Sequence, residues 1–300
     1  MAEGKERAAA RLENLEAIDP LLGSLRVLSL STMQMALNRL EALDHYSERF
    51  NSIAAQLTIL FKPTVLKPGV DKTFEFRPPT PKRILAVLGS TRGIAGQYNR
   101  QLAREVHAVV EHDDQQSLVV LAFGKRVQAT LAQEEIDFDA RDGLSTGSIP
   151  NYAQVSTLMR GWMQAFGEGR IESMEVISFR QQGQSTDYKP QLTHLLPEVE
   201  TREAGLAPIA LPWPKPIIEG DPRVLLERIS DHLIAIKFYK LILEAVAAEN
   251  LFRYRLLEEA KENTSSLLEE LRQSIQVERR KEITQQLQEL LVGSGMLVER

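Results

Sequence analysis

The stretch that decides the fold lies near the C-terminus, where residues 221–295 read DPRVLLERISDHLIAIKFYKLILEAVAAENLFRYRLLEEAKENTSSLLEELRQSIQVERRKEITQQLQELLVGSG. From Arg223 to Val292 there are 70 consecutive residues without Gly or Pro, and strong helix formers dominate them. Asp221-Pro222 and Gly293 supply the start and stop signals of a helix. A single helix of this length would extend roughly 105 Å, which a compact domain cannot bury. It must protrude, pair with another helix or enter a partner.

A second stretch without Gly or Pro covers residues 24–62, which is 39 residues. A shorter helical segment precedes it and ends near Ile18, where Asp19-Pro20 and Gly23 follow. Because a proline inside a helix removes a hydrogen bond and clashes with the preceding turn, we expect a break or kink at 19–23. Both ends of the chain are thus predicted to be helical. An antiparallel coiled coil of the two is the simplest way to bury their apolar stripes.

The C-terminal stripe falls close to a heptad seam, but polar residues interrupt it. The apolar seam positions are Ile229, Leu233, Ile236, Leu243, Leu257, Leu268, Leu271 and Ile275, and the interruptions are Lys240, Asn250, Lys261 and Thr264. A homodimeric zipper favours fewer interruptions, so an intramolecular antiparallel pair fits the register better. The polar seam positions facing a partner protein remain an alternative.

The middle of the chain has a different pattern. Short apolar runs at 83–88, 117–123 and 171–179 are typical of buried strands, and residues 99–112 and 155–166 have helical periodicity. Strands that alternate with helices predict a parallel, Rossmann-like α/β unit. The predicted fold class is therefore α/β, with a long antiparallel coiled coil of N- and C-terminal helices and a central Rossmann-like domain.

These patterns predict a division of the chain into four ranges. They are an N-terminal helix of the coiled coil (1–62), the α/β domain (63–205), a connector (206–222) and the long C-terminal helix (223–300). The connector carries five prolines, which make it stiff.

Composition excludes several classes of protein. With no Cys, the chain can form neither a disulfide scaffold nor thiolate metal ligation, and thiol control through it is ruled out. A net charge of −5 argues against a nucleic-acid-binding protein, which would show a basic face. No apolar run reaches the ~20 residues of a membrane span, and the charged N-terminus lacks the apolar region of a signal peptide. We expect a soluble, cytoplasmic protein.

The glycine turn at 89–96, GSTRGIAG, follows a predicted strand and opens a predicted helix, as a dinucleotide fingerprint requires. Its spacing, G-x3-G-x2-G, does not match that fingerprint strictly. The second strand ends at Phe123 with no acidic residue to hold a ribose hydroxyl, and the chain has no P-loop. We interpret the segment as a structural tight turn, and a nucleotide site stays open as the alternative.

The histidines do not form a recognisable metal site. Only His107, Glu111 and His112 lie close together, and their spacing differs from the i, i+4 pair of a zinc helix, so we interpret them as a solvated face. No Ser/His/Asp order or G-x-S-x-G motif occurs. We expect no catalytic residues, no cofactor and no metal.

Five motifs, at residues 91–99, 191–197, 219–222, 248–271 and 279–293, resemble in this order those of one family, the gamma subunit of F-type ATP synthases. Near the C-terminus, Arg279, Ile283-Thr284-Gln285, Leu287, Glu289 and Gly293 look like the family's A-R-Q-A-x-I-T-x-E-[IL]-x-E-I-[VI]-x-G ending. Upstream, Ala248-Glu249, Arg253, Asn263 and residues 267–271 are similar to its S-E-x-x-A-R-M…A-T-D-N…L-I-x-x-L run.

Three further motifs follow in the order of the family. Residues 91–96 with Asn99 resemble the family's D-R-G-L-C-G-x-x-N turn. Residues 191–197 resemble the end of its central domain, and residues 219–222 resemble its E-P-D-P motif. The resemblance covers roughly residues 24–295. Departures from the family pattern include Leu28 and Ser31, which stand where the family has lysines, and they indicate a divergent subunit.

The resemblance implies a rotor shaft that performs no bond chemistry. Such a shaft couples ion-driven rotation of a c-subunit ring to conformational cycling of a hexamer of alpha and beta subunits. The partners it implies are the alpha and beta subunits, the epsilon subunit and the c ring, with no nucleic acid. It also implies a peripheral position on the cytoplasmic side of a bacterial-type membrane.

Site residues are carried over from the family one by one. The candidates for contact with the alpha/beta ring are Met33, Arg253, Arg279, Thr284 and Gln286, and the candidate for contact with the c ring is Glu219. Gln286 stands where the family has an acid. Gly93 and Gly96 are assigned to the fold.

Two other functions stay open at this point. One is a Rossmann-type nucleotide-binding enzyme with helical extensions, which a bound nucleotide would favour. The other is a coiled-coil scaffold protein, which a concentration-dependent dimer would favour.

Overall fold

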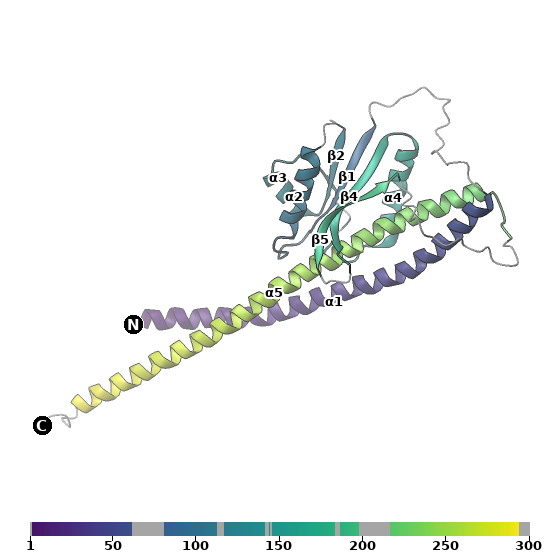
Figure 1. Cartoon of the computed structure of the whole chain (residues 1–300). Helices are drawn as coiled ribbons and strands as arrows, with labels where there is room; N and C mark the ends of the chain where they lie inside the picture. The colour runs from purple at the N-terminus through teal and green to yellow at the C-terminus, as the bar shows by residue number, and fades with distance from the viewer. Residues whose placement is uncertain are drawn as a thin grey trace. The chain divides into compact units, whose positions relative to one another are not determined.

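The structure is a computed structural model that describes residues 2–61, 81–112, 117–141, 144, 146–183, 187–197 and 217–293. Its elements in chain order are α1 (Ala2–Phe61), β1 (Lys82–Leu88), α2 (Tyr98–Glu111), β2 (Leu118–Phe123), α3 (Lys125–Gln133), β3 (Asp139–Arg141), α4 (Tyr152–Gly167), β4 (Ile171–Gln181), β5 (Tyr188–Leu196) and α5 (Pro222–Gly293) (Figure 1). The chain forms two compact units. The terminal unit comprises the described residues of 1–29 and 253–300, and the central unit comprises those of 30–252.

The central unit is built on a five-stranded sheet with the order β3-β2-β1-β4-β5. β1 pairs in parallel with β2 and with β4, β2 pairs in parallel with β3, and β5 pairs antiparallel with β4. Parallel strands need helical crossovers that cover the faces of the sheet. The last five residues of β1 are accordingly all buried.

Helices pack on both faces of this sheet. One face carries α2 and α3, whose Leu102, Val106 and Leu131 share a core with Val87 of β1. The other face carries α4 together with the central-unit part of α5, where Met159 and Phe238 are fully buried in a second core. The α/β class predicted from the alternation of strands and helices is confirmed.

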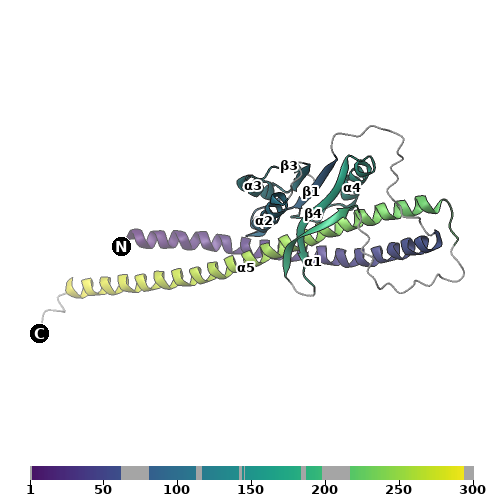
Figure 2. The ribbon, with the colours of Figure 1, turned by 45° about the horizontal axis from the view of Figure 1, so that its top comes forward.

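The long helices α1 and α5 pair in antiparallel fashion within the central unit (Figures 1 and 2). Arg39 donates to the Tyr239 hydroxyl at 3.3 Å, and the Tyr46 hydroxyl lies 3.1 Å from Nε2 of His232. The residue number rises on one helix as it falls on the other, so the two run in opposite directions.

The terminal unit repeats this antiparallel pairing. Arg272 donates to Glu16 at 2.6 Å, and Arg26 donates to Glu258 at 2.7 Å. Along this part of α1, the less exposed residues recur every three or four positions at Leu12, Leu15, Asp19, Leu22, Arg26 and Ser29. This 3-4 spacing is the seam of a coiled coil.

Of the break or kink expected at 19–23, the break does not occur. α1 is one continuous helix of 60 residues with Pro20 inside it. The proline removes a single N–H donor, and the Ser24 hydroxyl donates to the Pro20 carbonyl at 2.9 Å. Leu15 and Leu22 on either side belong to the seam. Packing in the seam, which contributes most helix stability in proteins, therefore outweighs the local cost of the proline.

The two units cut across the ranges expected from the sequence, because both long helices contribute to both units. Most of the proline-rich connector, up to residue 216, lies outside the described residues. Within the described residues, no helix is both long enough and apolar enough to cross a membrane.

Candidate functional site

The glycine turn after β1 is held by hydrogen bonds within the protein. The Gly89 amide donates to the Phe123 carbonyl at 2.9 Å, and the Ser90 amide donates to Oδ1 of Asn99 at 3.0 Å. A methyl group at Gly89 would overlap the side chain of Val127 on α3. Both amides therefore already donate hydrogen bonds within the protein. The absence of a side chain at Gly89 allows α3 to approach the turn.

The place where this fold type binds nucleotides is filled by α5. The strand order puts the topological switch point between β1 and β4, and ligands of such sheets bind outside the carboxyl ends of the strands there. Thr146 donates to the Gly89 carbonyl at 2.7 Å and also contacts the carboxylate of Glu249 on α5. Glu249 has no exposed surface. The Tyr98 hydroxyl lies 3.3 Å from the Ala245 carbonyl of the same helix. The described geometry favours a structural turn over a nucleotide site.

Two residues of the turn have the left-handed backbone conformation. Gly96 has φ 54°, which suits its assignment to the fold. Ile94 has φ 61° although it is β-branched, and its side chain is 51% exposed. Such a conformation is strained for isoleucine, so the surrounding turn must impose it.

The histidine cluster on α2 contains local contacts. Nδ1 of His107 lies 3.3 Å from the carboxylate of Glu111, with both side chains largely exposed, and Nδ1 of His112 lies 2.7 Å from the Ala108 carbonyl. Across the described ranges, no group of three His, Cys, Asp or Glu residues has the arrangement of a metal site.

The structure separates the candidates for ring contact into an inward and an outward set. Met33 is partly buried against the core of the central unit, and Arg253 is only 8% exposed. Arg279, Thr284 and Gln286 are exposed on the last third of α5. The structure thus brings these three onto one helix and holds Met33 and Arg253 inward.

Thr284 lies on an exposed face of α5 together with Arg280 and Lys281. Its hydroxyl donates to the Arg280 carbonyl at 2.8 Å. This face of the helix therefore carries two cationic side chains. The c-ring candidate, Glu219, is exposed just before α5 begins.

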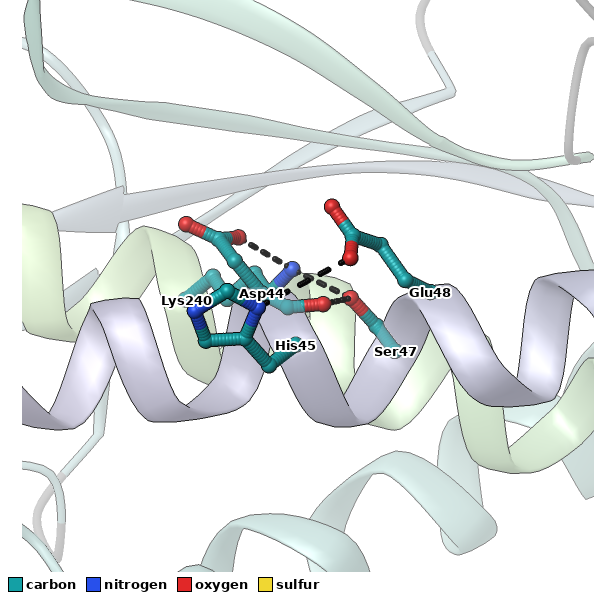
Figure 3. A network of polar contacts seen from close by, with 5 residues as sticks. All are labelled: Asp44, His45, Ser47, Glu48 and Lys240. Carbon is teal, nitrogen blue, oxygen red and sulfur yellow. Dashed lines mark hydrogen bonds and ion pairs between the residues drawn. The ribbon is translucent and has the colours of Figure 1, made fainter.

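A polar cluster interrupts the α1–α5 seam of the central unit (Figure 3). Nζ of Lys240 lies 2.6 Å from Oδ1 of Asp44 and donates to the Ser47 hydroxyl at 2.6 Å. Ser47 in turn donates to the Asp44 carbonyl at 3.0 Å. A lysine of α5 with two such partners on α1 matches only one register of the two helices, so the cluster fixes their axial alignment.

Sequence reasoning missed an exposed apolar stripe on the terminal-unit part of α1. Ile18, Leu21, Leu25 and Leu28 are between 40% and 62% exposed. They recur at the same 3-4 spacing as the seam but lie on a neighbouring face of the helix. That spacing was readable from the sequence. A second apolar stripe beside a buried one indicates a surface that a partner covers.

Comparisons with known proteins agree over nearly the whole chain. A family model described as ATP synthase matches residues 6–297. An ATP synthase gamma chain from Leptospira biflexa serovar Patoc is 23% identical over 297 residues, which is 95% of this chain and 96% of that relative. The gamma chain of Renibacterium salmoninarum is 23% identical over 303 residues, with 96% of each chain covered.

Solved structures share the fold. A chain of the Euglena gracilis mitochondrial ATP synthase, from a structure of OSCP, F1 and the c-ring, superposes with a TM-score of 0.61 at 11% identity. That match covers 100% of this chain and 98% of the other. A chain of the Tetrahymena thermophila mitochondrial ATP synthase, from a structure of the central stalk and c-ring, gives a TM-score of 0.54 at 16% identity, covering 80% and 99%.

Proposed function

The chain belongs to the gamma-subunit family of ATP synthases, and we propose which of its surfaces carry out the work of that subunit. The gamma subunit is the central rotor shaft of the complex and is not catalytic. The observation that carries this conclusion is the family match over residues 6–297, together with two continuous helices of 60 and 72 residues.

We propose that the terminal unit turns inside a hexamer of alternating alpha and beta subunits. Two features of its surface support this role. The stripe from Ile18 to Leu28 is an exposed apolar surface, and the face of α5 that bears Thr284 carries cationic and amide groups. These lie on separate helices of the coil, so different catalytic subunits around the shaft would meet different chemistry. Rotation of such an asymmetric body shifts each catalytic site among states of different nucleotide affinity.

Burial divides the proposed ring-contact residues by role. Arg279, Thr284 and Gln286 are exposed and are proposed to touch the ring directly. Met33 and Arg253 have little free surface. We assign these two to holding the coil in shape, so that the exposed residues keep their positions.

The central unit is proposed to face the remaining partners, the epsilon subunit and the c ring. Glu219 supports this because its side chain is exposed at the start of α5. The complex is membrane-associated, and this chain joins it without a described helix that could span the bilayer. We place the chain on the cytoplasmic side of that membrane.

The two alternative functions receive less support. An enzyme with a Rossmann-type nucleotide site would need the crevice that α5 occupies with Glu249 and Ala245. A self-associating scaffold would need a free seam, but α5 pairs with α1 in both units, through His232 and Tyr239 in the central unit and Glu258 and Arg272 in the terminal unit.

Co-expression with the cognate alpha and beta subunits tests the proposal. We expect a stoichiometric complex on size exclusion, in which this chain is required for steady ATP hydrolysis. The double substitution Leu21→Ser and Leu28→Ser should reduce that hydrolysis. Glu13→Ser, at an exposed α1 position outside the stripe, should leave it unchanged. A hexamer that turns over equally well without the chain would contradict the proposal.

A further inference from the structure

A hollow in the central unit lies apart from the proposed ring surfaces. It has a volume of about 820 Å³ and is formed by α1, by residues 149–152 and by α5. Its apolar wall includes Leu43, Ile149 and Ile236. This volume and lining lie within the range of small-molecule sites, which combine apolar walls with a few convergent polar groups.

Aromatic rings form another part of the wall. The His232 ring stands edge-on to Tyr46, with centroids 5.8 Å apart and planes at 79°, and to Tyr152, at 6.2 Å and 90°. Tyr152 and Tyr239 are 5.3 Å apart at 66°. In each edge-to-face pair the edge of one ring covers one face of the other, and the remaining faces are not covered by that partner. A planar ring of a ligand could pack against them.

The polar groups of the hollow have hydrogen-bond donors to spare. The Tyr46 hydroxyl lies 3.1 Å from Nε2 of His232, and the Tyr152 hydroxyl lies 3.3 Å from Nδ1. A neutral imidazole carries one N–H, so it donates to one tyrosine and accepts from the other. The tyrosine that accepts keeps its own hydroxyl hydrogen for another partner. Burial, followed by the nearby Tyr46, raises the pKa of Tyr152 and keeps its hydroxyl protonated.

The charge of the hollow has one sign. Arg39 supplies a guanidinium, of which one nitrogen donates to the Tyr239 hydroxyl at 3.3 Å. The Tyr239 hydroxyl in turn donates a hydrogen bond to the Pro150 carbonyl at 3.0 Å. No Asp or Glu is among the described lining residues. Free donors and a cation beside aromatic walls suit a ligand that carries hydrogen-bond acceptors and negative charge.

We propose that this hollow binds a planar aromatic molecule bearing an anionic group, with the rings of Tyr46, Tyr152 and Tyr239 around its aromatic part and Arg39 on its anion. Such a ligand would contact α1, α5 and the loop before α4 at once. It would brace the long helices against the α/β domain.

Paired fluorescent probes test this inference on the full chain. Anilinonaphthalene sulfonate is the anionic aromatic probe, and phenyl naphthylamine is its neutral counterpart. We expect saturable binding of the anionic probe. Arg39→Gln should weaken that binding about tenfold, as expected for the loss of a charged hydrogen-bond partner, and leave the neutral probe unaffected. Tyr152→Ala should weaken both probes.

Arg49→Gln is the matched control, since Arg49 is an exposed arginine of α1 outside the hollow, and it should change neither probe. Tyr46→Phe, which keeps the ring and removes one donor, should weaken only the anionic probe. If the affinity for the anionic probe is the same in Arg39→Gln, Tyr152→Ala and the unchanged chain, the probe binds elsewhere and the inference is wrong. Absence of saturable binding would also overturn it.

Discussion

The ion pair between Arg26 and Glu258 shows how single residues tie the two helices of the terminal unit together. One guanidinium nitrogen of Arg26 lies 2.7 Å from each carboxylate oxygen of Glu258. Hydrogen bonds from Arg26 and then from Tyr254 lower the pKa of Glu258 below its ordinary value of 4.5. The same carboxylate raises the pKa of Tyr254.

This arrangement gives the first prediction, a pH dependence of known sign. A carboxylate whose pKa is lower in the folded than in the unfolded chain adds stability above its unfolded pKa, and the gain is lost as pH falls through the folded pKa. Glu258→Gln should therefore lower the melting temperature at about pH 7 and have little effect at about pH 3. Thermal unfolding of both proteins across this range checks it. An equal difference at both pH values would contradict it.

A second prediction concerns two glycines with opposite surroundings. Gly89→Ala should destabilise the central unit by about 1–3 kcal/mol, because the added methyl overlaps Val127. Gly161→Ala in α4 should instead stabilise it by roughly 0.5–1 kcal/mol, since nothing lies within 4 Å of the new methyl and alanine favours the helix. Urea unfolding measures both. Destabilisation by Gly161→Ala would show that the helix does not have the described surroundings.

Residues such as these were only partly predictable from the sequence. The glycine turn was correctly placed between a strand and a helix. Its packing against Val127 of α3 was not predictable, because Val127 lies far from the turn in the sequence and local patterns do not report contacts between distant residues. Likewise, the covering of the turn by Glu249 depends on contact between residues about a hundred positions apart.

At the scale of elements, α1 is the clearest case of tertiary packing that outweighs a local signal. Pro20 and Gly23 both weaken an isolated helix, yet α1 continues through them. Gly23 faces α5 closely enough that a methyl there would lie 3.4 Å from Nζ of Lys261. The sequence pattern of one helix gives no information about the second helix that packs against it and stabilises it.

The third prediction follows from this continuity. Because proline costs about 3 kcal/mol relative to alanine inside a helix, Pro20→Ala should strengthen α1 locally. Hydrogen exchange of the amides of residues 21–24 should slow by about tenfold or more. The distant helix α2 serves as the internal control and should not change. Unchanged exchange at 21–24 would indicate that the helix is in fact broken there.

The strands show a similar division. β1, β2 and β4 were predicted because their apolar runs are buried on both faces. β5 was not predicted, since it is an edge strand with Pro190 inside it and mixes polar with apolar residues. β3 has only three residues, all exposed, and gives no periodic signal.

At the scale of the whole molecule, the chain is a non-catalytic shaft. Its family was predictable because ordered motifs are spread from the first helix to the last. Which motif residues face outward was not predictable, since the family pattern marks Arg253 and Arg279 alike. The structure buries Arg253 and exposes Arg279.

A fourth prediction tests that difference in the assembled complex. Arg279→Ala should lower ATP hydrolysis without changing the stability of the isolated chain, because an exposed side chain contributes little to folding. Arg253→Ala should lower the stability of the isolated chain, since it removes a buried side chain. Melting temperature and hydrolysis rate, measured together, separate the two roles. Equal loss of stability in both variants would contradict the division.

The most direct test of the central claim is to watch the chain rotate. The natural sequence has no Cys, so a single cysteine introduced at the exposed Glu219 gives one attachment point for a bead. With the alpha/beta hexamer fixed to a surface, we predict that ATP drives continuous rotation of the bead in one direction. A bead that stays still while the same complexes hydrolyse ATP would contradict the account.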